Sequence, residues 1–178
     1  MAPVRELALQ IFKVAKLLTY ETGIRVTKIY GGEPHKEQLD ELKNGIDILV
    51  STTGRLLDYL GSGVVNLSCL KYLVIDEADR ILDMGFEKQL NEILSNQNIP
   101  SINNRQNLLF SATFSKEIKR TIDNSLKNNY IKASNTPEDY VLNDNIDQKF
   151  YYVEEENKSK QLHLILQECV GNAISKIY

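Results

Sequence analysis

The stretch LVIDEADRILDMGF, residues 73–86, predicts how this chain folds. Its first three residues form a short apolar run of the kind that makes a buried strand, and Asp76, Glu77 and Asp79 follow it at once. Carboxylates in that position are costly unless they have partners. The apolar positions after them recur with helical spacing, which predicts one helical face through residues 82–94.

The same alternation of a short apolar run and a helical pattern recurs over residues 1–133. It predicts strands at residues 25–30, 47–50, 71–75 and 107–110. Helices are expected around them, with the apolar faces Leu7/Ile11/Val14/Leu18, Leu39/Leu42, Leu56/Leu57/Leu60 and Ile118/Ile122/Leu126. Strands that alternate with helices of this length indicate βαβ units. We therefore predict an α/β domain with a mostly parallel sheet and helices on both of its faces.

A second unit is expected to begin in the last part of the chain. Residues 134–145 are polar, contain a proline and show no clear period, which is typical of a linker. Residues 148–153 then alternate like a strand, and a helical pattern follows at 162–166. One strand and one helix cannot bury a core on their own. The predicted parts are a first domain at 1–133, the linker at 134–145 and the start of a second domain at 146–178.

Composition limits the kinds of partner that the chain can have. The 178 residues are 42% hydrophobic and carry a net charge of −3, with no block of Lys or Arg. Any contact with nucleic acid must therefore come from a few placed residues rather than from a general positive field. The two cysteines lie far apart, and we expect no membrane segment and no secretory signal. This pattern favours a reducing compartment, the cytoplasm, with the nucleus as an alternative.

Each predicted strand ends in a small or polar cluster. In an open parallel α/β sheet, ligands bind outside the carboxyl ends of the strands. We therefore expect the clusters to line one edge and to form a binding site there. They are Gly31-Gly32, Ser51–Arg55, Asp76–Asp79 and Ser111–Thr113.

The acidic cluster suits metal and nucleotide chemistry. A carboxylate just past a buried strand, such as Asp76, is placed as in folds that hold Mg²⁺ for nucleotide hydrolysis, often through water. A second carboxylate beside it, Glu77, could orient the attacking water or accept its proton. The alternative is structural: Asp76 would be the N-cap of a helix, and its acidic neighbours would be stabilised by the helix dipole.

The other clusters also have two interpretations each. Gly54 could let a backbone approach a phosphate while Arg55 clamps it, or the pair could be a flexible loop and a surface ion pair. Gly31-Gly32 could be a tight turn and nothing more. Ser111 and Thr113 could be helix N-caps.

Taken together, these motifs resemble those of the DEAD-box ATP-dependent RNA helicases. The segments LLFSATFSKEI at 108–118 and DNIDQKFYYVEEENKSKQLHLIL at 144–166 are most similar to the Vasa-like branch of that family. The resemblance covers about residues 1–153. Two motifs depart from the family pattern, because Val4 replaces the threonine of PTRELA and Thr53 replaces the proline of TPGR. The matching segments are PVRELA at 3–8, GG at 31–32, TTGR at 52–55, DEAD at 76–79 and SAT at 111–113.

The resemblance also shows which family motifs these residues do not include. None of the nine glycines is followed by lysine, so the sequence contains no P-loop of the form GxxxxGK[ST]. Motifs V and VI of the second domain, with the arginine finger, are not found either. We therefore expect a partial chain, from motif Ia to the start of the second RecA-like domain.

The resemblance implies a role for each site residue, with ATP and Mg²⁺ as cofactors. Asp76 would bind Mg²⁺ through water, and Glu77 would position the hydrolytic water, so both would be catalytic and lie on the ATP side. Asp79, Ser111 and Thr113 would link the nucleotide site to the RNA site. The residues that would line the path of an RNA strand are Pro3, Arg5, Gly32, Thr52, Gly54 and Arg55. They would hold mainly the sugar–phosphate backbone, without strong sequence preference; protein cofactors could be further partners.

Two functions stay open at this point. The resemblance implies an ATP-dependent RNA helicase that couples ATP binding and hydrolysis to local unwinding of RNA duplexes. The alternative is a catalytically inactive fragment that acts only as an RNA- or protein-binding module, because the residues that cradle the β- and γ-phosphates are not among these 178.

Overall fold

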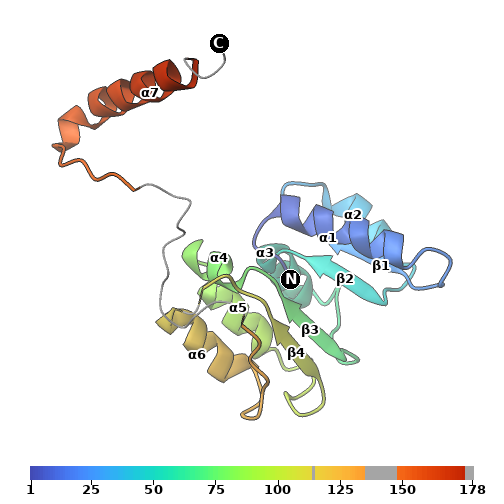
Figure 1. The fold of residues 1–178 in the computed structure, drawn as a ribbon. Helices are drawn as coiled ribbons and strands as arrows, with labels where there is room; N and C mark the ends of the chain where they lie inside the picture. The colour runs from blue at the N-terminus through green and yellow to red at the C-terminus, as the bar shows by residue number, and fades with distance from the viewer. Residues whose placement is uncertain (114, 135–147, 175–178) are drawn as a thin grey trace. The chain divides into compact units, whose positions relative to one another are not determined.

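The computed structural model describes residues 1–113, 115–134 and 148–174. They form two units, Met1–Ile131 and Lys132–Tyr178, which we describe separately (Figure 1). The predicted linker at 134–145 lies almost entirely outside the described residues, so its boundaries stay a prediction.

The strands of the first unit pair in parallel, as the sequence predicted. β1 (Val26–Ile29) pairs with β2 (Ile48–Ser51), and β3 (Tyr72–Ile75) pairs with β4 (Gln106–Leu109). The register places the first residue of each strand opposite the first residue of its partner. Each pair therefore has both of its carboxyl ends on the same edge.

Met1 and Ala2 lie between the two strand pairs. The Ala2 N–H donates to the Ser51 carbonyl of β2 at 2.9 Å. On the other side, the Met1 amino group donates to the Val74 carbonyl of β3 at 2.6 Å, and the Asp76 N–H donates to the Met1 carbonyl at 3.0 Å. Met1 and Ala2 thus bridge the edges of β2 and β3, which belong to two separate two-stranded sheets.

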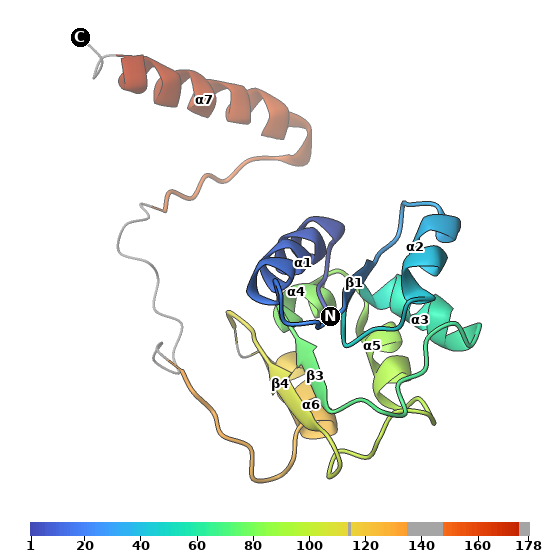
Figure 2. The ribbon, with the colours of Figure 1, turned by 90° about the vertical axis from the view of Figure 1, so that its right-hand side faces the viewer.

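Helices cover both faces of the β1–β2 pair, as predicted. Figure 2 shows α1 (Arg5–Leu18) on one side of β1, with α2 (His35–Leu42) and α3 (Thr53–Gly61) on the other. The alternating side chains of the strands explain this arrangement. Val26 and Val50 pack under α1, whereas Ile29 packs with the leucines of α2 and α3.

The β3–β4 pair differs from the prediction, because the described residues bury only one of its faces. Ile75 packs with apolar side chains of α4 (Ala78–Asp83), α5 (Glu87–Leu94) and α6 (Lys116–Ser125). On the opposite face Tyr72 is 64% exposed and Val74 is 40% exposed. Helices on both faces are therefore found for β1–β2 and not for β3–β4 within the described part of the chain.

The single helical face predicted through residues 82–94 is two helices, α4 and α5. Gly85 ends α4 with a φ of +80°, a left-handed conformation that glycine adopts without a Cβ clash. Its N–H donates to the Leu82 carbonyl, and the Phe86 N–H donates to the Ile81 carbonyl. This pair of bonds is a Schellman motif, so the apolar spacing continues through a break in the backbone.

The apolar face predicted for α1 is also only partly right. Val14 is 51% exposed and Leu18 is 75% exposed, while Ala8 is fully buried against the sheet. The neighbouring stripe of Ala8, Phe12 and Ala15 packs on β1 and β2 instead. Two apolar stripes lie side by side on this helix, and the sequence pattern did not distinguish them.

The second unit contains a short 3₁₀ turn, η1 (Glu155–Asn157), and α7 (Lys158–Ile174). The helix agrees with the prediction, but the strand predicted at 148–153 is not formed. Phe150 is 91% exposed and Tyr152 is 99% exposed. A strand needs a partner, and no described residue pairs with this segment. None of the helices described in either unit is both long and apolar enough to cross a membrane.

Candidate functional site

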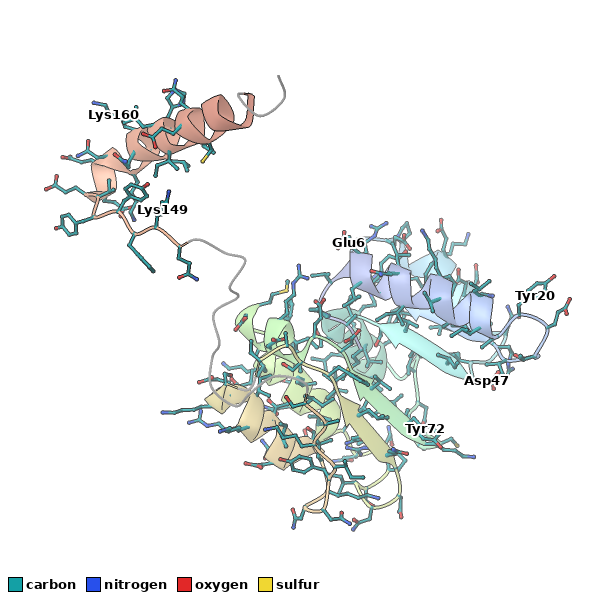
Figure 3. The ribbon with its side chains drawn as sticks, viewed as in Figure 1. Glu6, Tyr20, Asp47, Tyr72, Lys149 and Lys160 are labelled. Atoms are coloured by element: carbon teal, nitrogen blue, oxygen red, sulfur yellow. The ribbon has the colours of Figure 1, made fainter. Side chains whose placement is uncertain are left out.

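The polar clusters gather at the carboxyl edge of the strands. β2 leads into α3 at Thr52, β3 leads into the acidic cluster, and β4 leads toward Ser111. Asp47 precedes β2 and Tyr72 is the first residue of β3, and in Figure 3 both lie at the opposite edge. The structure thus brings the predicted clusters to one edge, where parallel sheets of this kind bind ligands.

Asp76 lies where β3 ends, half-buried. Its Oδ1 accepts the Glu77 N–H at 3.0 Å, and its own N–H bonds to the Met1 carbonyl. It also borders a groove of about 400 Å³ whose other lining residues come from α1, among them Leu7 and Val14. The N-cap position of α4 belongs to Glu77, so the alternative in which Asp76 is the N-cap is wrong.

Glu77 adopts a backbone conformation that non-glycine residues rarely use. Its φ of 47° and ψ of 53° are left-handed, and its side chain does not cap α4. Such conformations cost about 1–3 kcal/mol and are frequent at functional sites. The carboxylate is paired with Arg80 at 3.1 Å on the surface of the first turn. Glu77 would have to leave this partner in order to position a water molecule.

Asp79 connects the acidic cluster to the segment after β4. Its Oδ2 accepts both the Thr113 N–H at 3.0 Å and the Thr113 hydroxyl at 3.1 Å. The Ser111 hydroxyl accepts the backbone N–H of Asp79 at 3.3 Å and donates to the Thr113 carbonyl at 2.9 Å. Thr113 therefore reaches the Asp79 carboxylate, whereas Ser111 bonds to the backbone N–H of Asp79.

Ser111 and Thr113 do not cap the helix that follows them. The N-cap of α6 is Ser115, whose hydroxyl accepts the Ile118 N–H at 3.3 Å. The capping alternative for the two earlier residues is therefore wrong. Their hydrogen bonds serve the contact between the loops that follow β3 and β4.

The residues present fit the way in which proteins hold Mg²⁺ beside a nucleotide. No cluster of three or more potential metal ligands occurs among the described residues. Mg²⁺ usually keeps several waters and takes one or two carboxylates plus substrate phosphates, so a dedicated cage is not required. Asp76 can supply such a carboxylate, because within the described part of the chain only its Oδ1 accepts a hydrogen bond.

Arg5 and Gly32, two of the predicted RNA contacts, lie together. Gly32 has a φ of +81°, and a Cβ built on it would lie 3.7 Å from Arg5 Nη1. The guanidinium of Arg5 also lies over the Tyr30 ring, 4.9 Å from its centre. Arg5 is the first residue of α1 and its side chain is 43% exposed, so it is accessible to a ligand.

Glu33 is a site residue that the sequence analysis missed. Its Oε1 accepts from Arg5 Nη2 at 3.0 Å and from the Tyr30 hydroxyl at 2.7 Å. Burial and this hydrogen bond raise the pKa of Tyr30 to about 12, so the phenol stays a donor. The only signal in the sequence is an acidic residue directly after the Gly31-Gly32 pair.

Arg55 is buried, so it does not form the surface ion pair that was one of its two predicted roles. It lies in the first turn of α3 and is 8% exposed. Its guanidinium donates to the Glu33 carbonyl at 3.3 Å and to the Tyr59 hydroxyl at 3.4 Å. These contacts favour a structural role, and a phosphate contact by Arg55 stays a prediction.

The other predicted RNA contacts differ in how open they are. Gly54 lies in the same helical turn as Arg55, with nothing within 4 Å of the Cβ that it lacks, which leaves room for a ligand to approach the backbone. Thr52 is the N-cap residue of α3 and is half-buried, and Pro3 is buried. The roles of these three residues stay predictions.

The motif order and this geometry agree with a comparison with known families. The family model described as DEAD/DEAH box helicase matches residues 1–121. The chain belongs to this family. Among relatives, it is 51% identical over 128 residues to DEAD-box ATP-dependent RNA helicase 52A of Oryza sativa subsp. japonica. The aligned region covers 72% of the chain and 21% of the relative. It is 46% identical over 163 residues to the probable ATP-dependent RNA helicase ddx3 of Dictyostelium discoideum, covering 91% of the chain and 22% of the relative.

Solved structures of DEAD-box and other RNA helicases have the same fold. A hypothetical ATP-dependent RNA helicase from Sulfolobus tokodaii matches with a TM-score of 0.64 and 36% identity, over 71% of this chain and 37% of that one. The yeast DEAD-box splicing factor Prp28 matches with a TM-score of 0.66 and 36% identity, over 70% of this chain and 29% of that one. The predicted RecA-like α/β fold is confirmed. The chain spans about a fifth of the length of the curated relatives that it matches.

Proposed function

We propose that this DEAD-box chain forms the part of an ATP-dependent RNA helicase that joins the nucleotide site to the RNA path. The observation that carries the proposal is the contact between Asp79 and Thr113. It ties the acidic cluster at the end of β3 to the loop after β4, with both the N–H and the hydroxyl of Thr113 on one carboxylate oxygen.

In this proposal Asp76 and Glu77 act on the nucleotide. The Asp76 carboxylate would hold Mg²⁺ through water, and the ion would supply positive charge beside the phosphates. Glu77 orients the attacking water and accepts its proton, a role that needs its carboxylate to turn away from Arg80. Glu77 lies at the N-cap position of α4 in a left-handed conformation, and its side chain makes no capping bond that would have to break.

On the RNA side, Arg5 supplies a positive charge to a phosphate, and the glycines let the strand approach the backbone. Pro3, Gly32, Thr52 and Gly54 complete this path, with Arg55 behind it. Contacts of this type position a strand without reading its sequence. Closure of two RecA-like domains on ATP and RNA would then bend the strand and open a short duplex.

A second function is favoured by a feature of the sequence itself. These 178 residues include no P-loop, so on their own they lack the amides and the lysine that hold the β- and γ-phosphates. We propose that the chain as it stands binds single-stranded RNA and does not hydrolyse ATP.

The test uses the chain by itself and in a chimera that adds the P-loop segment and second domain of a DEAD-box relative. The isolated chain should bind single-stranded RNA and release no phosphate from ATP above a Glu77→Gln control. The chimera should hydrolyse ATP in the presence of RNA and unwind a short duplex. Glu77→Gln in the chimera should keep nucleotide affinity and slow single-turnover hydrolysis about a hundredfold or more. Unchanged hydrolysis in that variant would refute the role given to Glu77.

A further inference from the structure

The side chain of Glu33 forms an ion pair with Arg5, the arginine that is exposed on the proposed RNA path. Arg5 and Arg55 are the two arginines predicted to line that path, and Arg55 is almost fully buried. Arg5 therefore carries the accessible charge, yet its Nη2 is bound to Glu33 Oε1 at 3.0 Å. A carboxylate in this position repels a phosphate and competes with it for the same N–H donors.

Two contacts and one backbone conformation hold Glu33 in place. The buried Tyr30 donates its hydroxyl to the same oxygen, Oε1, that Arg5 uses. Arg55 donates to the main-chain carbonyl of Glu33. The left-handed backbone of Gly32 precedes it in the turn. The position of the carboxylate thus comes from the packed loop and does not depend on Arg5 alone.

The ion pair itself is weak enough to open. The side chains of Arg5 and Glu33 are 43% and 24% exposed, and ion pairs with such access to water contribute little to stability. A phosphate that offers several oxygens can therefore replace the carboxylate, whereas Tyr30 and Arg55 keep Glu33 near its place.

We propose that Glu33 is a carboxylate brake on RNA binding: it holds Arg5 in the RNA-free state and must release it when a phosphate of the RNA backbone binds. This proposal rests on the proposed RNA-binding function. Glu33 acts through Arg5, so it sets the affinity for any single strand and does not set sequence preference.

The experiment measures binding of a short fluorescein-labelled oligouridylate to the full 178-residue chain by anisotropy, over a series of salt concentrations. Glu33→Gln keeps the size of the side chain and an oxygen for Tyr30. It should raise affinity roughly three- to tenfold, the range expected when one competing exposed ion pair and its repulsion are removed. The slope of log affinity against log salt should steepen by up to about 0.7, one additional phosphate contact.

Two matched variants separate this effect from a general change in charge or in folding. Glu37→Gln removes the same charge from the exposed first turn of α2 and should change affinity little. In an Arg5→Ala background, Glu33→Gln should lose most of its effect. Melting temperatures of all variants check that the fold is kept.

The outcomes are distinguishable. If Glu33→Gln weakens binding while the fold is kept, Glu33 positions Arg5 for RNA and the brake is refuted. Unchanged affinity and salt slope would refute it as well. If neither the parent chain nor any variant binds RNA, the proposed RNA-binding function fails, and the brake fails with it.

Discussion

The hydroxyl of Thr113 should be energetically coupled to the carboxylate of Asp79. Thr113→Val keeps the shape of the side chain and removes only the O–H that lies 3.1 Å from Asp79 Oδ2. A hydrogen bond to a charged group contributes about 1.5–3 kcal/mol. Both residues are half-buried, and the Thr113 N–H still bonds to the same oxygen, so we expect the lower end, about 1.5 kcal/mol.

A double-mutant cycle with Asp79→Ala measures this coupling directly, by urea or thermal unfolding followed by circular dichroism. Thr113→Val should destabilise the parent chain by about 1.5 kcal/mol and should have almost no effect once Asp79 is alanine. Ser115→Ala is the control. Like Thr113→Val, it removes one hydroxyl, but this hydroxyl accepts the Ile118 N–H and does not contact Asp79. Loss of this helix cap should cost about 1 kcal/mol. Its effect should add to that of Asp79→Ala within about 0.5 kcal/mol.

If Thr113→Val and Asp79→Ala are as additive as the control pair, the hydroxyl contact contributes nothing to stability. The two loops would then not be joined by this bond. If the cycle shows the coupling, Thr113→Val in the helicase chimera should impair unwinding more than ATP hydrolysis, because a bond that differs between open and closed forms affects the step that connects them.

Three further predictions concern the backbone and packing of the site, all measured as free energies of unfolding. Val4→Thr should stabilise the chain by up to about 1 kcal/mol, because Val4 is the N-cap of α1 in an extended conformation and has no side-chain hydrogen bond to offer; Val4→Ala, which gains no cap, should not. Glu77→Gly should be more stable than Glu77→Ala by roughly 0.5–1 kcal/mol, since both lose the pair with Arg80 but only alanine keeps the left-handed strain; equal stability would contradict it. Arg55→Ala should lower stability by about 1–3 kcal/mol, because it leaves the Glu33 carbonyl without that donor in a half-buried loop. If Arg55→Ala keeps its stability and loses only RNA affinity, the result would support a phosphate contact by Arg55 instead.

The sequence predicted the strands and their edge well because both depend on local patterns. Each strand is a short apolar run, and each is followed by small or polar residues, which is enough to place the clusters at the carboxyl ends. The Asp79–Thr113 contact could be expected as well, once β3 and β4 were taken as neighbours. The strand predicted at 148–153 was wrong because alternation alone does not supply a partner strand.

The features of the site that the sequence did not predict depend on tertiary contacts. Nothing local distinguishes an arginine that clamps a phosphate from one that turns inward, and Arg55 turns toward Tyr59 and the Glu33 carbonyl. The capping alternative for Ser111 and Thr113 was wrong, because α6 begins at Lys116 and its N-cap is Ser115. Gly85 separates α4 from α5, although the apolar spacing continues across it. The spacing was misleading because it shows which face is buried and does not show whether the helix backbone is continuous.

The two carboxylates that organise the site differ in how tightly they are held, and this difference suggests which side responds to a ligand. Asp79 accepts three N–H or O–H bonds, two from Thr113 and one from the Arg80 N–H. Glu33 instead shares one oxygen between a buried phenol and an exposed guanidinium. A contact that is equal in both states shifts no equilibrium, so the exchange of Arg5 between Glu33 and phosphate is where RNA binding can change this structure. The Asp79–Thr113 contact transmits the effect of a ligand only if it differs between the open and closed forms, and the unwinding assay on Thr113→Val in the chimera tests that difference.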